Sequence, residues 1–93
     1  MDFTIISPSG KKTYPINWIE INTPKGNFII QPGHAPMIIA LSQKRPLTFG
    51  LKNGKRESII IQEGIISITR THATVITNQD LWKLHLAPLS PDR

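Results

Sequence analysis

Apolar residues in this chain recur at every second position or in short runs of isoleucine and valine, and glycine, proline and asparagine separate the runs. A repeat of two is typical of strands with one buried face, whereas a helix repeats its apolar positions every three to four residues. The pattern predicts eight strands and nothing helical before residue 79. The predicted strands span residues 3–7, 14–22, 27–31, 37–41, 47–51, 57–62, 65–70 and 73–78.

The predicted turns carry their own chemistry. The Asn-Gly pair in 52–55 tolerates positive φ at both central positions and predicts a tight hairpin. The segments 7–10 and 23–26 each place proline second and glycine fourth, which also turns the chain. Eight short strands would leave one apolar face of a single sheet in water. We therefore predict an all-β fold, a two-sheet β-sandwich or flattened barrel of about eight to ten short strands.

The run Ile59–Ile61 places isoleucine on both faces of its strand. This strand is expected either to be central and covered on each side or to meet a partner with one face. At 93 residues the chain has room for one domain, predicted to span residues 1–79. Residues 80–93 are expected to form a short tail with at most one docked strand, since Trp82, Leu84 and Leu86 alternate with polar residues. Pro88 and Pro91 exclude a long helix there.

The charge balance favours an acidic partner. Eleven Lys and Arg stand against six Asp and Glu, a net charge of +5 that suits nucleic acid, an anionic membrane or an acidic protein, or simply keeps a small domain soluble. A single-strand binder interleaves basic and aromatic residues on one face. Here the aromatic residues are spread thinly along the chain and mostly fall at strand positions that a core would claim, so they do not interleave with the basic cluster. The cluster comprises Lys44, Arg45, Lys52, Lys55 and Arg56.

Catalytic and metal-binding patterns are missing from the sequence. His34, His72 and His85 are too scattered for a metal site, no nucleophile elbow surrounds a serine, and cysteine does not occur. We therefore expect no enzyme activity, no metal and no cofactor. The longest unbroken apolar run, Met37–Leu41, has five residues, and the N-terminus has no leader pattern, so neither a visible secretion signal nor membrane insertion is expected.

Residues 26–37 read GNFIIQPGHAPM, which closely resembles the motif G-E-(F/L)-G-(I/V)-(L/Y)-P-G-H-A-P-L of the epsilon subunit of F-type ATP synthase, the counterpart of the mitochondrial delta subunit. The segments 3–8, 60–68 and 74–78 are also similar to that family, so the resemblance covers roughly residues 2 to 79. It implies a β-sandwich in a non-catalytic rotor subunit that links the gamma subunit to the c-ring. It also implies a peripheral place at the cytoplasmic face of the bacterial inner membrane. The alternative is a free-standing basic sandwich that binds nucleic acid or an acidic protein.

The resemblance assigns roles to individual residues. Pro32 and Gly33 shape a rigid loop between two strands, because proline restricts φ and glycine reaches conformations closed to other residues. The residues implied to contact gamma are Ser7, His34, Ala35, Pro36, Met37 and Ile39. The residues implied to contact the c-ring are Pro24, Lys25, Gly26, Asn27 and Phe28.

The chain also departs from the family pattern. Ile29 and Glu63 replace family glycines, Lys44-Arg45-Pro46 replaces a Pro-Gly pair, and Lys25 and Asn27 replace two acids. Family members typically continue as a two-helix hairpin that inhibits ATP hydrolysis and, in some members, binds ATP. The tail of this chain lacks the alanine-rich helical pattern, so we expect no C-terminal helical hairpin, no such inhibition and no ATP binding.

Overall fold

The computed structural model describes residues 1–79, which form eight strands; within this range there is no helix that could cross a membrane. The strands are β1 (Asp2–Ser7), β2 (Gly10–Thr23), β3 (Gly26–Ile30), β4 (Met37–Ala40), β5 (Arg45–Leu51), β6 (Arg56–Ile61), β7 (Gly64–Ile68) and β8 (His72–Thr77). All eight predicted strands are present. β2 begins at Gly10 rather than Tyr14, because Gly10 pairs with Ser7 and extends the β1–β2 hairpin through residues that are polar in sequence. The predicted tail strand lies outside the described residues.

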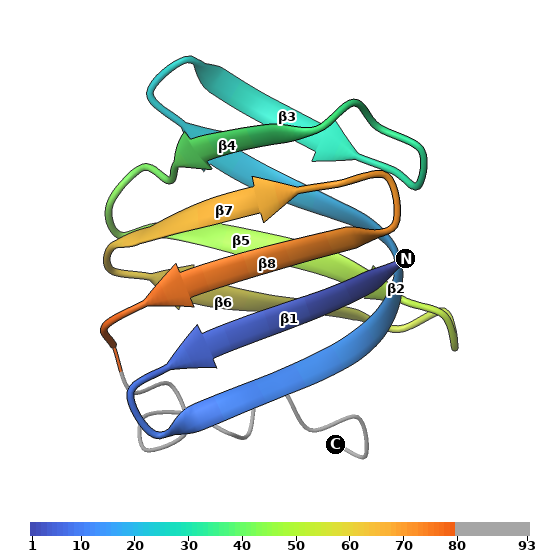
Figure 1. The fold of residues 1–93 in the computed structure, drawn as a ribbon, viewed down its shortest axis with the longest axis horizontal. Helices are drawn as coiled ribbons and strands as arrows, with labels where there is room; N and C mark the ends of the chain where they lie inside the picture. Colours follow the sequence, from blue (N-terminus) through green and yellow to red (C-terminus); the bar gives the residue numbers. More distant parts are fainter. Residues whose placement is uncertain (80–93) are drawn as a thin grey trace.

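The eight strands divide between two sheets, which confirms the predicted β-sandwich (Figure 1). Sheet A contains β4, β7, β8, β1 and the first part of β2. Sheet B contains β3, the rest of β2, β5 and β6. All neighbouring strands are antiparallel except β1 and β8, which run parallel.

β2 belongs to both sheets. Its residues from Gly10 to Pro15 pair with β1, and its residues from Ile16 to Glu20 pair with β5. The register with β5 shifts between Ile16 and Trp18, and an irregularity of this kind bends a strand and lets it pass from one sheet to the other. A single strand of fourteen residues therefore ties the two layers together.

The core lies between the sheets and is built from alternate residues of every strand except β4. Phe3 and Phe49 lie in its centre with ring centroids 4.9 Å apart, and the half-buried Tyr14 stacks against them, with its ring centroid 5.5 Å from that of Phe49. The buried apolar residues are Phe3, Ile5, Ile16, Ile19, Ile21, Ile30, Leu41, Leu47, Phe49, Ile59, Ile61, Ile66, Ile68, Ala73 and Val75.

Two sequence-based expectations need correction. β6 pairs only with β5 among the described strands, so Ile59–Ile61 lies on an edge strand and is not central. Ile59 and Ile61 are buried, but Ile60 is 49% exposed, so one face of β6 is open. In the hairpin at 52–55 only Gly54 has positive φ, because the Asn53 side chain accepts a hydrogen bond from the Lys55 N–H (2.9 Å) and shapes the turn itself.

Candidate protein-binding face

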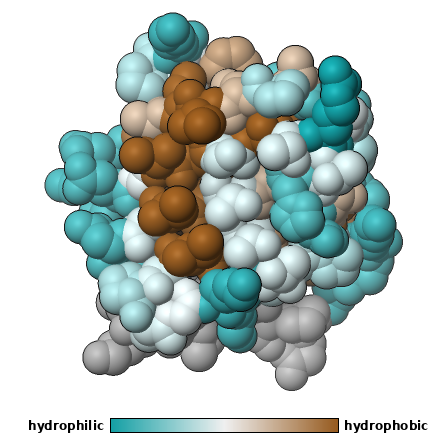
Figure 2. Space-filling view, in the orientation of Figure 1, coloured by the Kyte–Doolittle hydropathy of each residue, from teal (hydrophilic) through white to brown (hydrophobic). Residues whose placement is uncertain are grey.

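The outer face of sheet A carries a band of exposed isoleucine, which we call the isoleucine stripe: Ile38, Ile65, Ile76 and Ile6. These side chains are 76%, 51%, 55% and 36% exposed, in that order. Ile65 pairs with Ile76 across β7 and β8, and Ile76 pairs with Ile6 across β8 and β1. Figure 2 shows the band as a brown column that crosses the strands.

The stripe follows from pairs of β-branched residues in the sequence. Because neighbouring side chains of a strand point to opposite faces, each pair places one member in the core and one outside. Ile66 and Val75 are buried, and their neighbours Ile65 and Ile76 are exposed. Alternation within each pair indicates that one member faces away from the other, but the alignment of the outer members into a stripe depends on strand pairing.

The middle of this face is polar and uncharged, and charged residues such as Lys11, which pairs with Ile6, lie at its margin. On the same face Thr4 and Thr13 share a hydrogen bond of 2.9 Å, and Ser67 pairs with Thr74 across β7 and β8. Exposed apolar residues in a contiguous band indicate an interaction surface, and protein interfaces are poor in charge at their centre. This face is therefore suited to bind another protein.

The loop of residues 31–36 lies beside this face and is held in one conformation. The Gly33 N–H donates to the Arg70 carbonyl (2.8 Å), and the Arg70 guanidinium donates back to the Gly33 carbonyl (3.3 Å). Gly33 has φ of 91°, which favours glycine. The His34 ring donates from Nδ1 to the Ala35 carbonyl (2.7 Å), so this histidine is engaged within the loop itself.

The residues predicted to contact gamma do not all lie on one surface. His34, Ala35 and Pro36 are exposed or half-buried in the loop. Met37 and Ile39 point inward from β4 and pack against the core, so β4 presents Ile38 and Ala40 instead. Ser7 is buried at the far end of β1, where its hydroxyl donates to the Gly10 carbonyl (3.4 Å). The predicted gamma contact of the loop therefore stays a prediction, and the sequence-based set did not include the outward-facing isoleucines.

The residues predicted to contact the c-ring form the turn between β2 and β3. The Thr23 hydroxyl braces this turn, since it donates to the Gly26 carbonyl (3.0 Å) and accepts from the Lys25 N–H (3.1 Å). Pro24, Lys25 and Asn27 are exposed, whereas Phe28 packs against the core. The turn is a rigid, polar projection at the edge of sheet B.

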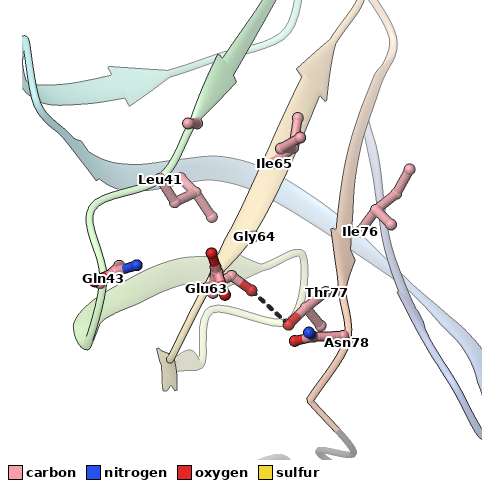
Figure 3. A pocket seen from close by; sticks show the side chains of 9 residues that line it. Leu41, Gln43, Glu63, Gly64, Ile65, Ile76, Thr77 and Asn78 are labelled. Atoms are coloured by element: carbon pink, nitrogen blue, oxygen red, sulfur yellow. Dashed lines mark hydrogen bonds between the residues drawn. The ribbon is translucent and has the colours of Figure 1, made fainter.

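A pocket of about 550 Å³ lies at the end of the isoleucine stripe (Figure 3). Ile65 and Ile76 belong to both features, and Leu41 adds to the apolar lining. Its polar residues are Gln43, Glu63, Thr77 and Asn78. The Thr77 hydroxyl donates to the Glu63 carbonyl oxygen (2.7 Å), which joins the start of β7 to the end of β8.

The remaining polar groups offer little for catalysis or nucleic-acid recognition. No group of His, Asp or Glu suited to a metal ion occurs within residues 1–79. Phe3, Tyr14 and Phe49 are occupied in the core stack, and Trp18 is half-buried with the Arg56 guanidinium 5.4 Å from its ring centroid. The described part of the chain therefore does not present a series of aromatic platforms beside its basic residues.

The described residues form a β-sandwich with an apolar stripe on the outer face of sheet A. The chain belongs to the ATP synthase delta/epsilon chain family, whose β-sandwich domain matches residues 1–83. No curated protein matches the chain in sequence.

Two solved structures share the fold. One chain of the Euglena gracilis mitochondrial ATP synthase, from a structure of its OSCP, F1 and c-ring, is 20% identical with a TM-score of 0.75. The match covers 83% of this chain and 49% of that chain, so this chain spans about half the length of its Euglena counterpart. A chain from the central stalk and c-ring of the Tetrahymena thermophila mitochondrial enzyme is 14% identical with a TM-score of 0.68, over 100% of this chain and 75% of that one.

Proposed function

We propose that this chain is a non-catalytic central-stalk subunit of an F-type ATP synthase, which links the gamma subunit to the c-ring. Membership of the delta/epsilon family supports this role, and so do the two solved structures, which contain a c-ring together with F1 or the central stalk. Both come from mitochondria, so the expected place at the bacterial inner membrane stays a prediction.

The observation that carries the gamma contact is the isoleucine stripe. A rotor subunit must stay attached while torque passes through the stalk, and burial of exposed apolar surface gives an attachment that salt does not screen. The braced loop of residues 31–36 extends the same face and loses little entropy when it docks. We assign this face to gamma and the β2–β3 turn to the c-ring.

The test is binding to a gamma-containing ATP synthase subcomplex from the same source. We expect binding that survives high salt, and we expect Ile65→Thr with Ile76→Thr to weaken it by about tenfold or more through lost apolar burial. Threonine keeps the β-branched shape that a strand favours, so the fold should persist. Ile60→Thr is the matched control, because Ile60 is similarly exposed but lies on sheet B.

Two results would contradict the proposal. One is equal affinity of the double variant and the parent for the subcomplex. The other is binding to unrelated oligonucleotides, with a steep salt dependence, in preference to the subcomplex, which would favour the nucleic-acid alternative.

A further inference from the structure

We propose that the pocket at the end of the isoleucine stripe receives a basic side chain of the partner, with its aliphatic stem against the apolar lining and its charged head on the Glu63 carboxylate. This inference rests on the proposed function, because the partner is the protein that docks on the stripe. It names a specific anchor within that interface.

The lining of the pocket suits an aliphatic stem. Ile65 and Ile76 belong to both the stripe and the pocket, and Leu41 lies on the other side of Ile65 from Ile76 (Figure 3). A partner segment that covers the stripe therefore reaches the pocket without crossing a charged surface. Lysine and arginine bury their methylene groups along such a surface while the head stays at a polar rim.

Glu63 supplies the matching charge. Its carboxylate makes no hydrogen bond or ion pair within residues 1–79, whereas its backbone is held by Thr77. The other carboxylates of residues 1–79 interact with neighbouring groups. The Asp2 carboxylate lies 4.0 Å from the His72 ring, and the Glu20 carboxylate accepts a hydrogen bond from the Asn27 amide (3.0 Å). The negative charge of Glu57 raises the pKa of Tyr14. Among the carboxylates of residues 1–79, that of Glu63 is therefore the one open to a partner at this face.

The pocket also suits a cation better than other ligands. The chain carries a net charge of +5, so an acidic group without a partner among residues 1–79 gives a docking cation a defined register. In Figure 3, Glu63 lies between Gln43 and the pair Thr77 and Asn78. The side-chain oxygens of Gln43 and Asn78 can accept the further hydrogen bonds that a guanidinium or an ammonium donates, whereas the Thr77 hydroxyl is engaged by the Glu63 carbonyl and the Gln79 N–H.

The first experiment compares Glu63→Gln with the parent for affinity to the gamma-containing subcomplex at low and high salt. We expect the variant to bind roughly fivefold more weakly at low salt, and the difference to shrink at high salt because salt screens an exposed ion pair. Glu20→Gln is the matched control, since that carboxylate lies on sheet B, and it should bind like the parent.

The second experiment identifies the cation. Glu63→Lys should weaken binding further, and reversal of one lysine or arginine on gamma should restore it. Two results overturn the inference. One is that Glu63→Gln binds as tightly as the parent at low salt. The other is that no single charge reversal on gamma restores the affinity of the Glu63→Lys variant. If Ile65→Thr with Ile76→Thr still weakens binding in those cases, only the anchor fails; if it does not, the proposed function fails as well.

Discussion

Tyr14 combines an apolar setting with a polar group that has no partner. Its ring stacks with Phe49 in the core, yet its hydroxyl is buried without a hydrogen bond. A buried, unpaired hydroxyl costs free energy that a phenyl ring avoids. Burial raises the pKa of Tyr14 above 10.0, and the nearby Glu57 carboxylate raises it further.

The first prediction concerns the pH dependence of stability. Below pH 10 the tyrosine is neutral in both states. Above pH 10 the Tyr14 hydroxyl loses its proton in the unfolded chain but keeps it in the folded chain, so unfolding releases a proton. The free energy of unfolding therefore falls as pH rises from 10 toward the higher pKa of the folded chain. Tyr14→Phe should remove the share of the loss of stability at alkaline pH that is due to Tyr14. Urea unfolding of the parent and the variant from neutral to alkaline pH measures the difference.

A direct control is available because the chain contains one tyrosine. A pH titration of the folded parent, followed by the ultraviolet absorbance of tyrosinate, measures the pKa of Tyr14 directly because no other tyrosine contributes to the signal. A midpoint at or below 10.0 would show that burial does not hold the proton.

The second prediction concerns Ala35, which is exposed in the loop beside the stripe. Ala35→Arg should weaken gamma binding by on the order of 3 kcal/mol, because docking would bury a charge without a partner. Ala35→Ser adds a small group without charge and serves as the control. Equal affinity of the arginine variant and the parent would remove the loop from the interface.

At the scale of elements, the β2–β3 turn tests the c-ring contact. Lys25 stands at its tip, where the family pattern has an acid. Lys25→Glu should strengthen docking onto a c-ring whose loop carries arginine and weaken docking onto the cognate ring, since like charges repel. Affinities for both rings at low and physiological salt measure the effect, and no change at either salt would exclude this contact.

Asn27 is a less suitable site for the same charge change. Its amide donates to the Glu20 carboxylate (3.0 Å) and to the Asn22 side chain (3.1 Å). Asn27→Glu would lose both bonds and set two carboxylates against each other, so any effect on docking would be mixed with strain in the turn. Lys25 makes the cleaner test because its hydrogen bond to Thr23 comes from the backbone.

At the scale of the whole molecule, binding and folding should be linked. If gamma binds only the folded chain, the chain gains about 2.7 kcal/mol when the subcomplex is present at about 100 times its dissociation constant. Hydrogen exchange of the chain's slowest amides measures this gain. The variant with both Ile65→Thr and Ile76→Thr should gain little stability at the same concentration of subcomplex. A gain equal to that of the parent would place the binding face elsewhere.

The sequence by itself determined the strands, their turns and the family. Alternation specifies which residues of a strand share a face, and glycine and proline mark where strands end, because these are local properties of the backbone. The motif around Pro32 to Pro36 identified the family for the same reason, since a rigid loop needs particular residues in a particular order. Within the predicted contact with gamma, this loop is the part that a local sequence motif indicates.

Only the tertiary structure decided which face is open and what gathers on it. Alternation cannot tell whether the outer member of an isoleucine pair meets another layer, and this depends on strand order, which places β6 at an edge. The stripe arises because β1, β7 and β8 pair in a register that aligns Ile6, Ile65 and Ile76. The same pairing sets Glu63 beside Thr77, fourteen positions apart in sequence. Contacts between distant segments form through packing of the whole core, and no local pattern encodes them.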